Sequence, residues 1–229
     1  MAKSFYPDEL QSLLHGVPEW LTDHCGASVV VVFGCGPSLD EMPTGFWAAA
    51  GQYLTIGVNG FPILQPVINN NFSPDIILGI DPMRVQNWPE NYDGIRKYWE
   101  SKQPEDKPLR LMDIANCVNT DSDLYFQQTP VWSEKRGHCK FGRSSVQAAV
   151  NWIANEVKPK VIALFGVDYK GAGRAGGLIG NTSHQPGKRL EKTFKEMFDA
   201  AKEIGIKIIN CSPGTGLKAI PTADWKTIL

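Results

Sequence analysis

The sequence predicts an α/β fold with a doubly wound, mostly parallel sheet that is covered by helices on both faces. Apolar runs typical of strands alternate along the chain with segments of helical periodicity, which is the order found in parallel sheets. The runs are nearly continuous, and the first one, residues 29–33, contains no polar side chain. Strands of this kind are buried on both faces, so helices are expected on both sides of the sheet.

Each element can be placed from its pattern in the first half of the chain. A helix is expected over residues 8–24, where leucines recur at three- and four-residue intervals and Pro18 marks a break. The first strand, 28–33, precedes a short helix over 44–50 with Thr44 as its N-cap. Further elements are expected as strands over residues 53–58, 75–80 and 109–112 and as a helix over 92–101.

The second half resumes the alternation after a segment with little periodicity. Residues 115–138 are expected to be irregular, with a β segment near Val131, and a loop of that length is often functional. An apolar stripe predicts a helix over 144–157. A strand over 161–165, an amphipathic helix over 190–204 that stops at Gly205, and a last strand over 206–210 complete the pattern.

Composition favours a single domain over residues 1–229 in a cytoplasmic protein. Hydrophobic residues make up 42% and charged residues 21% of the chain, as in ordinary soluble domains. The net charge of −1 gives no strong field for a polyanion, so a nucleic-acid partner is not expected. We expect no membrane span and no signal peptide, because no long apolar run is present. Nothing in the composition decides against a homo-oligomer.

The five cysteines are expected to be free thiols, because their number is odd and none form a CxxC pair. They are Cys25, Cys35, Cys117, Cys139 and Cys211. Cysteines and histidines are scattered along the chain rather than clustered at ligand spacing, so no metal site is predicted.

Small and polar residues follow the predicted strands, at the edge where open parallel sheets bind ligands. Asn59 follows the second strand and Asp81 the third, while Gly166 and Asp168 follow the strand over 161–165. Each aspartate is suited to a metal, a ribose hydroxyl or the cap of a turn. Together these strand ends suit the close approach of a phosphate or a sugar.

The turn after the first strand consists of Gly34, Cys35, Gly36, Pro37 and Ser38, followed by Leu39. Its two glycines allow a sharp turn and a close approach to a ligand, and Ser38 offers donors to a phosphate. Leu39 stands where the dinucleotide fingerprint needs its third glycine, and Pro37 lacks an N–H donor, so an NAD or FAD site is not expected. The alternative is a purely structural strand-to-helix turn.

A helix start and a histidine add candidates to the same edge. Ser144 or Ser145 is expected to cap the helix over 144–157, whose free N–H groups and positive dipole end suit an anion. His184 lies in a polar segment of a small lid over residues 171–187, where a near-neutral pKa suits a general base. The alternatives are a serine that only caps the helix and an idle loop histidine. His138 is the second candidate for the base.

Several of these residues resemble a known superfamily. The GCGPSL turn from Gly34, Asn59 after the second strand, the Ser144-Ser145 pair and the ALFGVDY segment over 163–169 occur in this order. The set resembles the Rossmann-like superfamily of bacterial CMP-sialic-acid-dependent sialyltransferases. That superfamily also includes proteins similar to 6-hydroxymethylpterin pyrophosphokinase and uncharacterised phage-encoded proteins. The resemblance runs from about Val29 to Cys211 and is weak over residues 85–140.

The resemblance implies a nucleotide site and a reaction. In the sialyltransferases the GxGPS turn, the asparagine and the helix-start serine hold the CMP part of the donor, and a lid histidine is the general base. By position this implies nucleotide contacts at residues 34–38, Asn59, Ser144 and Ser145, and His184 as the base. The sequence departs from the pattern at Cys35, where those enzymes have asparagine, and after Asp168, where their tyrosines are shifted relative to Tyr169.

Three functions are therefore expected in order of preference. The first is glycosyl transfer from a CMP-sugar type donor to an unknown acceptor hydroxyl, without a firmly assigned cofactor. The second is an ATP-dependent pyrophosphokinase, which would need magnesium at Asp81 or Asp168. The third is a non-catalytic nucleotide-binding protein, such as a phage-encoded one. The partner is in each case a small-molecule nucleotide.

Overall fold

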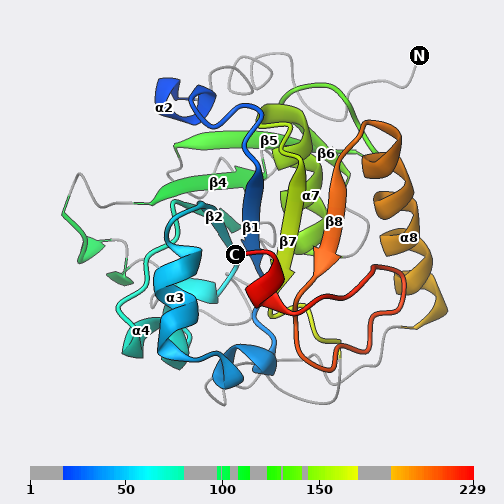
Figure 1. The fold of residues 1–229 in the computed structure, drawn as a ribbon. Coiled ribbons are helices and arrows are strands. Elements are labelled where there is room, and N and C mark those ends of the chain that lie inside the picture. Colours follow the sequence, from blue (N-terminus) through cyan, green and yellow to red (C-terminus); the bar gives the residue numbers. More distant parts are fainter. Residues whose placement is uncertain are drawn as a thin grey trace.

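The computed structural model describes residues 18–79, 97–98, 100–103, 108–113, 123–129, 131–140, 144–169 and 187–229. Within these residues an eight-stranded sheet has the order β6-β5-β4-β3-β2-β1-β7-β8, and each neighbouring pair is parallel (Figure 1). Helices cover both faces of this sheet. The predicted doubly wound α/β fold is confirmed.

The strands are β1 (Val29–Phe33), β2 (Leu54–Val58), β3 (Ile76–Gly79), β4 (Leu109–Asp113), β5 (Leu124–Thr129), β6 (His138–Lys140), β7 (Val161–Phe165) and β8 (Lys207–Asn210). The helices are α2 (Glu19–Thr22), α3 (Thr44–Ala50), α4 (Gln65–Asn69), α7 (Ser145–Glu156) and α8 (Lys188–Glu203). Short 3₁₀ turns are η2 (Pro37–Glu41), η3 (Phe61–Ile63) and η7 (Trp225–Thr227).

The strand order reverses between β1 and β7. From β1 the chain moves outward through β2 to β6, and it then returns to the other side of β1 with β7 and β8. Val29 pairs with Val161, and the two strands stay in register up to Phe33 and Phe165. Ligands of open α/β sheets bind beyond the carboxyl ends of the strands at such a reversal, so the fold itself points to the loops after β1 and β7.

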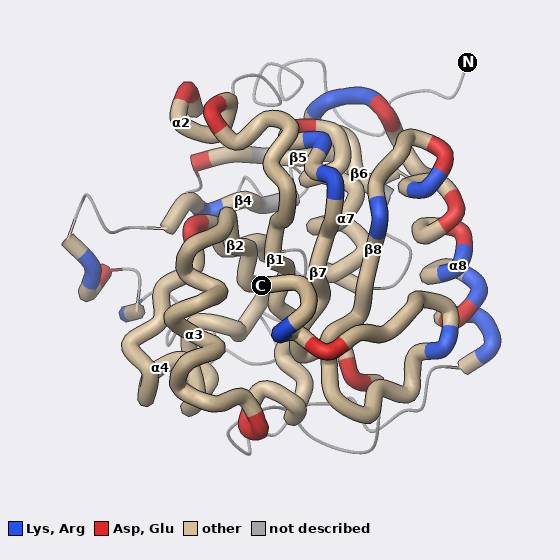
Figure 2. The backbone as a smooth tube through the Cα atoms, viewed as in Figure 1, with Lys and Arg blue, Asp and Glu red and all other residues tan. Residues whose placement is uncertain are grey.

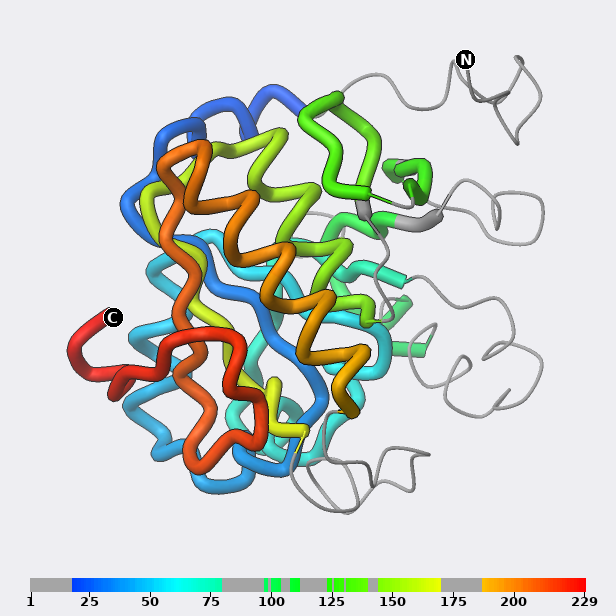
Figure 3. Tube along the Cα trace, turned by 90° about the vertical axis from the view of Figure 1, so that its right-hand side faces the viewer, coloured from blue at the N-terminus to red at the C-terminus, as the bar shows by residue number. Residues whose placement is uncertain are grey.

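Alternate side chains of β1 enter two separate apolar cores. Val30 and Val32 pack under α7 and α8, which run side by side over one face (Figure 3). Val31 and Phe33 pack under α3 on the other face, where the Phe33 ring stacks on that of Phe61 with centroids 4.6 Å apart. Burial of one such aromatic side chain stabilises the fold by about 1.5–3 kcal/mol, so the all-apolar sequence of β1 anchors both layers.

The two helices over the first face differ in burial. Helix α7 is almost wholly buried, including its polar residues Asn151, Asn155 and Glu156. These side chains hold the segment before β6: Asn155 donates to the carbonyl oxygens of Lys135 and His138, and Glu156 accepts from Arg136. Helix α8 buries Phe194, Met197 and Ala201 and carries charges of both signs on its outer side, whereas β1, β2 and β7 carry none (Figure 2).

The structure corrects several local predictions. Pro43, not Thr44, is the N-cap of α3, and no side chain caps this helix; Thr44 is its first residue. The segment 115–138 is not irregular throughout, because it contains β5 and leads into β6, while Val131 lies in a bend between them and is 64% exposed. Both strands lie at the outer end of the sheet and mix polar with apolar residues, so they lack the continuous apolar run of a central strand.

Other expected elements hold within the described residues. Helix α2 begins after Pro18, which is its N-cap, and residues 8–17 of the predicted helix lie outside the described residues. Helix α4 and turn η3 were not expected, because Pro62 and Pro66 hide their short periodicity. Helix α8 ends at Glu203 with Ile204 as its C-cap, and Gly205 follows the cap with φ +81°, close to the predicted stop. None of the described helices is long and apolar enough to cross a membrane.

Candidate functional site

The loop after β1 lies directly against the continuation of β7. The N–H of Gly34 donates to the carbonyl oxygen of Phe165 at 2.7 Å, and the N–H of Gly36 donates to that of Gly166 at 2.8 Å. A Cβ built on Gly34 would lie under 3.0 Å from the oxygen of Gly166, and one on Gly36 would come equally close to the carboxylate of Asp168. The two glycines are therefore required by the contact between two loops of the protein itself.

Ser38 and Asp168 close this contact. The N–H of Ser38 donates to Oδ2 of Asp168 at 2.7 Å, and the Ser38 hydroxyl donates to Oδ1. Both residues are buried, with 3% and 4% of their surfaces exposed. Burial raises the pKa of Asp168, the two bonds from Ser38 partly offset this, and the nearby carboxylate of Glu41 adds to the rise.

This pair changes the interpretation of both residues. The N–H and the hydroxyl of Ser38 both donate to the carboxylate of Asp168. Asp168 was expected to bind a metal, bind a ribose hydroxyl or cap a turn, and this arrangement supports the cap of a turn. Their predicted contact with a nucleotide remains a prediction. The pair ties the loops after β1 and β7 together at the reversal point of the sheet.

A third loop, after β8, supports the segment that follows β7. The N–H of Val167 donates to the hydroxyl of Ser212 at 2.8 Å, and the N–H of Gly216 donates to the carbonyl oxygen of Asp168 at 2.6 Å. Thr215 donates to the same carbonyl oxygen of Asp168 at 3.0 Å. The position of Asp168 is therefore fixed from β8 as well as from β1.

The N-terminus of α7 lies beside these loops and is held from two strands. Ser144 is the N-cap, and its Oγ accepts the N–H of Val146 at 3.3 Å, as expected for one of the two serines. Asn59, at the end of β2, donates from Nδ2 to the hydroxyl oxygen of Ser145 at 2.7 Å. Tyr169, after β7, donates from its hydroxyl to Oγ of Ser144 at 2.7 Å.

Cys35 connects the loop after β1 to β2. Its thiol donates to the carbonyl oxygen of Val58 at 3.3 Å, directly before Asn59. Cys35, Gly36 and Pro37 are half-buried, as are Asn59, Ser144, Ser145 and Tyr169. Ser38 and Asp168, in contrast, lie beneath them. The half-buried residues are thus the part of this edge that remains open to contact with a ligand.

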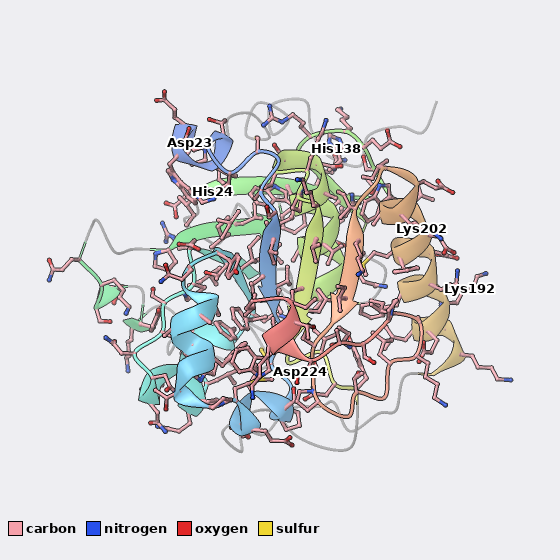
Figure 4. The ribbon with its side chains drawn as sticks, in the orientation of Figure 1. Asp23, His24, His138, Lys192, Lys202 and Asp224 are labelled. Atoms are coloured by element: carbon pink, nitrogen blue, oxygen red, sulfur yellow. The ribbon has the colours of Figure 1, made fainter. Side chains whose placement is uncertain are left out.

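The remaining candidates fall into two groups. Asp81 and His184, with the predicted lid up to residue 186, lie outside the described residues, so their roles stay predictions. His138 begins β6 and lies above Asp224 in the view of Figure 4. Its carbonyl oxygen accepts from Asn155 near the C-terminal end of α7, whereas Ser144 is the N-cap of the same helix. His138 is therefore far from the carboxyl ends where the other candidates meet. Within the described residues, no group of three or more histidines, cysteines or acidic residues could hold a metal ion.

Tyr169 is the residue of this edge that sequence reasoning did not assign. The sequence placed it next to Asp168, but nothing in its pattern indicated that its hydroxyl would reach the first turn of α7. Asn210, the last residue of β8, and Ser212 were recognisable only as polar residues at the end of the last strand, and Thr215 was not singled out. Their bonds to the loop after β7 depend on the pairing of β7 with β8.

No family model matches the chain, and no curated protein matches it. Among solved structures the chain is similar to the MAf glycosyltransferase from Magnetospirillum magneticum AMB-1, with a TM-score of 0.61 and 14% identity. The similarity covers 89% of this chain and 34% of that chain, so this chain spans about a third of its length. At this identity the likeness establishes a shared fold.

Proposed function

We propose that the chain is a nucleotide-binding transferase that moves a glycosyl group from a CMP-sugar type donor to an acceptor hydroxyl. One observation carries the proposal. The loop after β1 is tied to the loop after β7 by Ser38 and Asp168 where the strand order reverses, and the N-terminus of α7 lies beside them. A nucleotide phosphate suits a helix N-terminus that is presented at such an edge.

The residues suited to the nucleotide are those that remain half-buried at this edge. Cys35, Gly36 and Pro37 would contact it from the loop after β1, and Asn59, after β2, would support the site through its bond to Ser145. The hydroxyls of Ser144 and Ser145 and the N–H groups of the first turn of α7 would receive the phosphate, because all of them can donate hydrogen bonds. Asp168 and Ser38 would act from beneath by keeping the loop in place.

The choice of a glycosyl donor rests on two further lines of support. The GCGPSL turn, Asn59 and the paired serines resemble the donor site of the bacterial sialyltransferases. The fold is shared with a protein that is itself a glycosyltransferase. That the donor is a CMP-sugar and that the acceptor is a hydroxyl group are both part of the proposal.

The proposed reaction is a direct displacement at the anomeric carbon. His184 would take the proton of the acceptor hydroxyl, whose oxygen would form the new glycosidic bond. The bond between the anomeric carbon and the phosphate oxygen would break, and CMP would leave with the electron pair. Donors at the N-terminus of α7 would stabilise the negative charge of the departing phosphate.

A nucleotide panel read by thermal unfolding tests the proposal. At a hundredfold excess over its dissociation constant, a ligand stabilises the folded state by about 2.7 kcal/mol. We expect CMP and CDP to raise the unfolding temperature without added metal, and a CMP-sugar to be consumed when an acceptor is supplied. Stabilisation by ATP only with magnesium would favour the pyrophosphokinase instead. No stabilisation by any nucleotide would overturn the proposal.

A further inference from the structure

Two residues after different strands hold the two serines that begin α7. The hydroxyl of Tyr169 donates to Oγ of Ser144, and Nδ2 of Asn59 donates to Oγ of Ser145, each over 2.7 Å. β7 and β2 flank β1 on its two sides, so the start of α7 is held from both sides of the central strand. We call these two bonds the serine clamp.

Both clamp residues have an unusual backbone conformation. Among the described residues, the non-glycine residues with positive φ are Asn59 (52°), Asn71 (48°), Lys158 (53°) and Tyr169 (46°). Asn71 and Lys158 directly follow the C-caps of α4 and α7, where this conformation is common. Asn59 and Tyr169 instead follow strands. Asparagine adopts this conformation more readily than other non-glycine residues, so Tyr169 is the less common case. A bulky residue held in this conformation outside a helix end is typical of functional sites.

The clamp leaves each serine hydroxyl with one defined role. Oγ of Ser144 accepts from Tyr169 and from the N–H of Val146, so both of its acceptor positions are used. Oγ of Ser145 accepts from Asn59. No described residue accepts the hydroxyl proton of either serine. Because the hydroxyls of Ser144 and Ser145 accept hydrogen bonds from the protein, each still has its own proton to donate. The pair therefore suits a ligand group that only accepts hydrogen bonds.

We infer that Tyr169 and Asn59 are positioning residues that fix Ser144 and Ser145 as paired donors to the phosphate of the nucleotide. The inference rests on the proposed function, and it adds residues that act on the ligand through the serines. Tyr169 is itself held from α8, because its ring makes an edge contact with that of Phe194 at 5.6 Å between centroids. The clamp thereby connects α8, β7, β2 and the start of α7.

The clamp can be opened without removing the packing around it. Tyr169→Phe keeps the ring contact with Phe194 and deletes only the hydroxyl. Asn59→Asp keeps the shape, but the carboxylate cannot donate, so the Ser145 hydroxyl must turn its proton toward this new carboxylate and away from a ligand. Tyr53→Phe is the matched control, because it deletes a tyrosine hydroxyl that donates to the carbonyl oxygen of Leu229 at 3.1 Å, on the C-terminal tail.

The test measures dissociation constants for CMP and for cytidine, which lacks the phosphate. For CMP we expect Tyr169→Phe to weaken binding by about three- to tenfold, the effect of one hydrogen bond, and Asn59→Asp by about tenfold or more. Tyr53→Phe should bind CMP like the wild type. The affinity for cytidine should be the same in all four proteins, which a general disturbance of the fold would not produce.

A double-mutant cycle separates positioning from direct contact. If Tyr169 acts through Ser144, Tyr169→Phe should cost no further CMP affinity once Ser144→Ala is present. Additive losses would overturn the positioning role in favour of direct contact, and unchanged CMP affinity in both clamp variants would overturn the inference alone. Failure of the wild type to bind any nucleotide would instead overturn the proposed function, and the inference with it.

Discussion

Ser38 donates both its N–H and its hydroxyl to the carboxylate of Asp168, which lies 130 positions further along the chain. The two residues follow adjacent parallel strands, and both are almost fully buried. Because the proposed nucleotide site is built on the loops that carry them, changes to this pair should alter stability and ligand binding together.

The first prediction concerns the pH dependence of Asp168. Burial raises the pKa of its carboxyl above the ordinary value of 3.8, so the folded chain binds this proton more readily than the unfolded chain. The corresponding stabilisation is full below pH 3.8 and is lost as the pH rises through the folded pKa. Asp168→Asn cannot ionise, so it lacks this loss. Its stability relative to the wild type should therefore increase from acid toward neutral pH.

Urea unfolding at a series of pH values checks this prediction. The control is Asp40→Asn, which removes an exposed carboxyl from the same 3₁₀ turn that contains Ser38. Parallel stability curves for the wild type and Asp168→Asn would show that the carboxyl has no raised pKa in the folded protein.

The second prediction compares two glycines. Gly36→Ala places a methyl group against Asp168 and the oxygen of Gly166, so it should destabilise the fold by about 1–3 kcal/mol or more and weaken nucleotide binding. Gly45→Ala is the matched control, because nothing lies within 4 Å of a Cβ there, near the start of α3. It should stabilise by about 0.5–1 kcal/mol. Denaturant midpoints of the two variants measure the contrast, and a neutral Gly36→Ala would contradict the close approach of the two loops.

The third prediction concerns thiol reactivity. Burial and the nearby carboxylate of Asp224 raise the pKa of Cys211 to about 12, so almost no thiolate is present near neutral pH. Cys139 is also buried, whereas Cys25 is exposed. Brief treatment of the folded protein with iodoacetamide, followed by peptide mass spectrometry, should find Cys25 modified and Cys211 and Cys139 protected. In denaturant all three should react. Rapid labelling of Cys211 in the folded protein would be inconsistent with the β8 packing.

The fourth prediction concerns the proposed general base. His184→Ala should lower turnover by roughly 10²-fold or more while leaving the affinity for CMP intact, because a base acts on the acceptor and not on the nucleotide. His138→Ala should leave turnover unchanged, since His138 contacts the C-terminal end of α7 and the proposed site lies at the N-terminus of that helix. Steady-state kinetics with a CMP-sugar donor measures both. Equal activity of His184→Ala and the wild type would remove His184 from the mechanism.

The sequence by itself determined the central sheet. The all-apolar run from Val29 to Phe33 and its counterparts in β2 and β7 can only be stable when covered on both faces, so fold class and strand positions followed from local pattern. An N-cap at Ser144 or Ser145 and a glycine stop for α8 at Gly205 were also predictable locally, because capping depends on neighbouring residues; the structure assigns the cap to Ser144. The outer strands β5 and β6 did not follow, because their mixed composition becomes a strand only through pairing within the sheet.

Only the tertiary structure decided how the residues at the strand ends are used. The sequence marked Gly34, Gly36, Ser38 and Asp168 as ligand candidates, yet the structure brings them against one another, since β1 and β7 are adjacent although far apart in the chain. It likewise turned Tyr169 and Asn59 toward the serines of α7. Local pattern reveals which residues end a strand, but their partners are set by the order of the strands, which no local pattern contains.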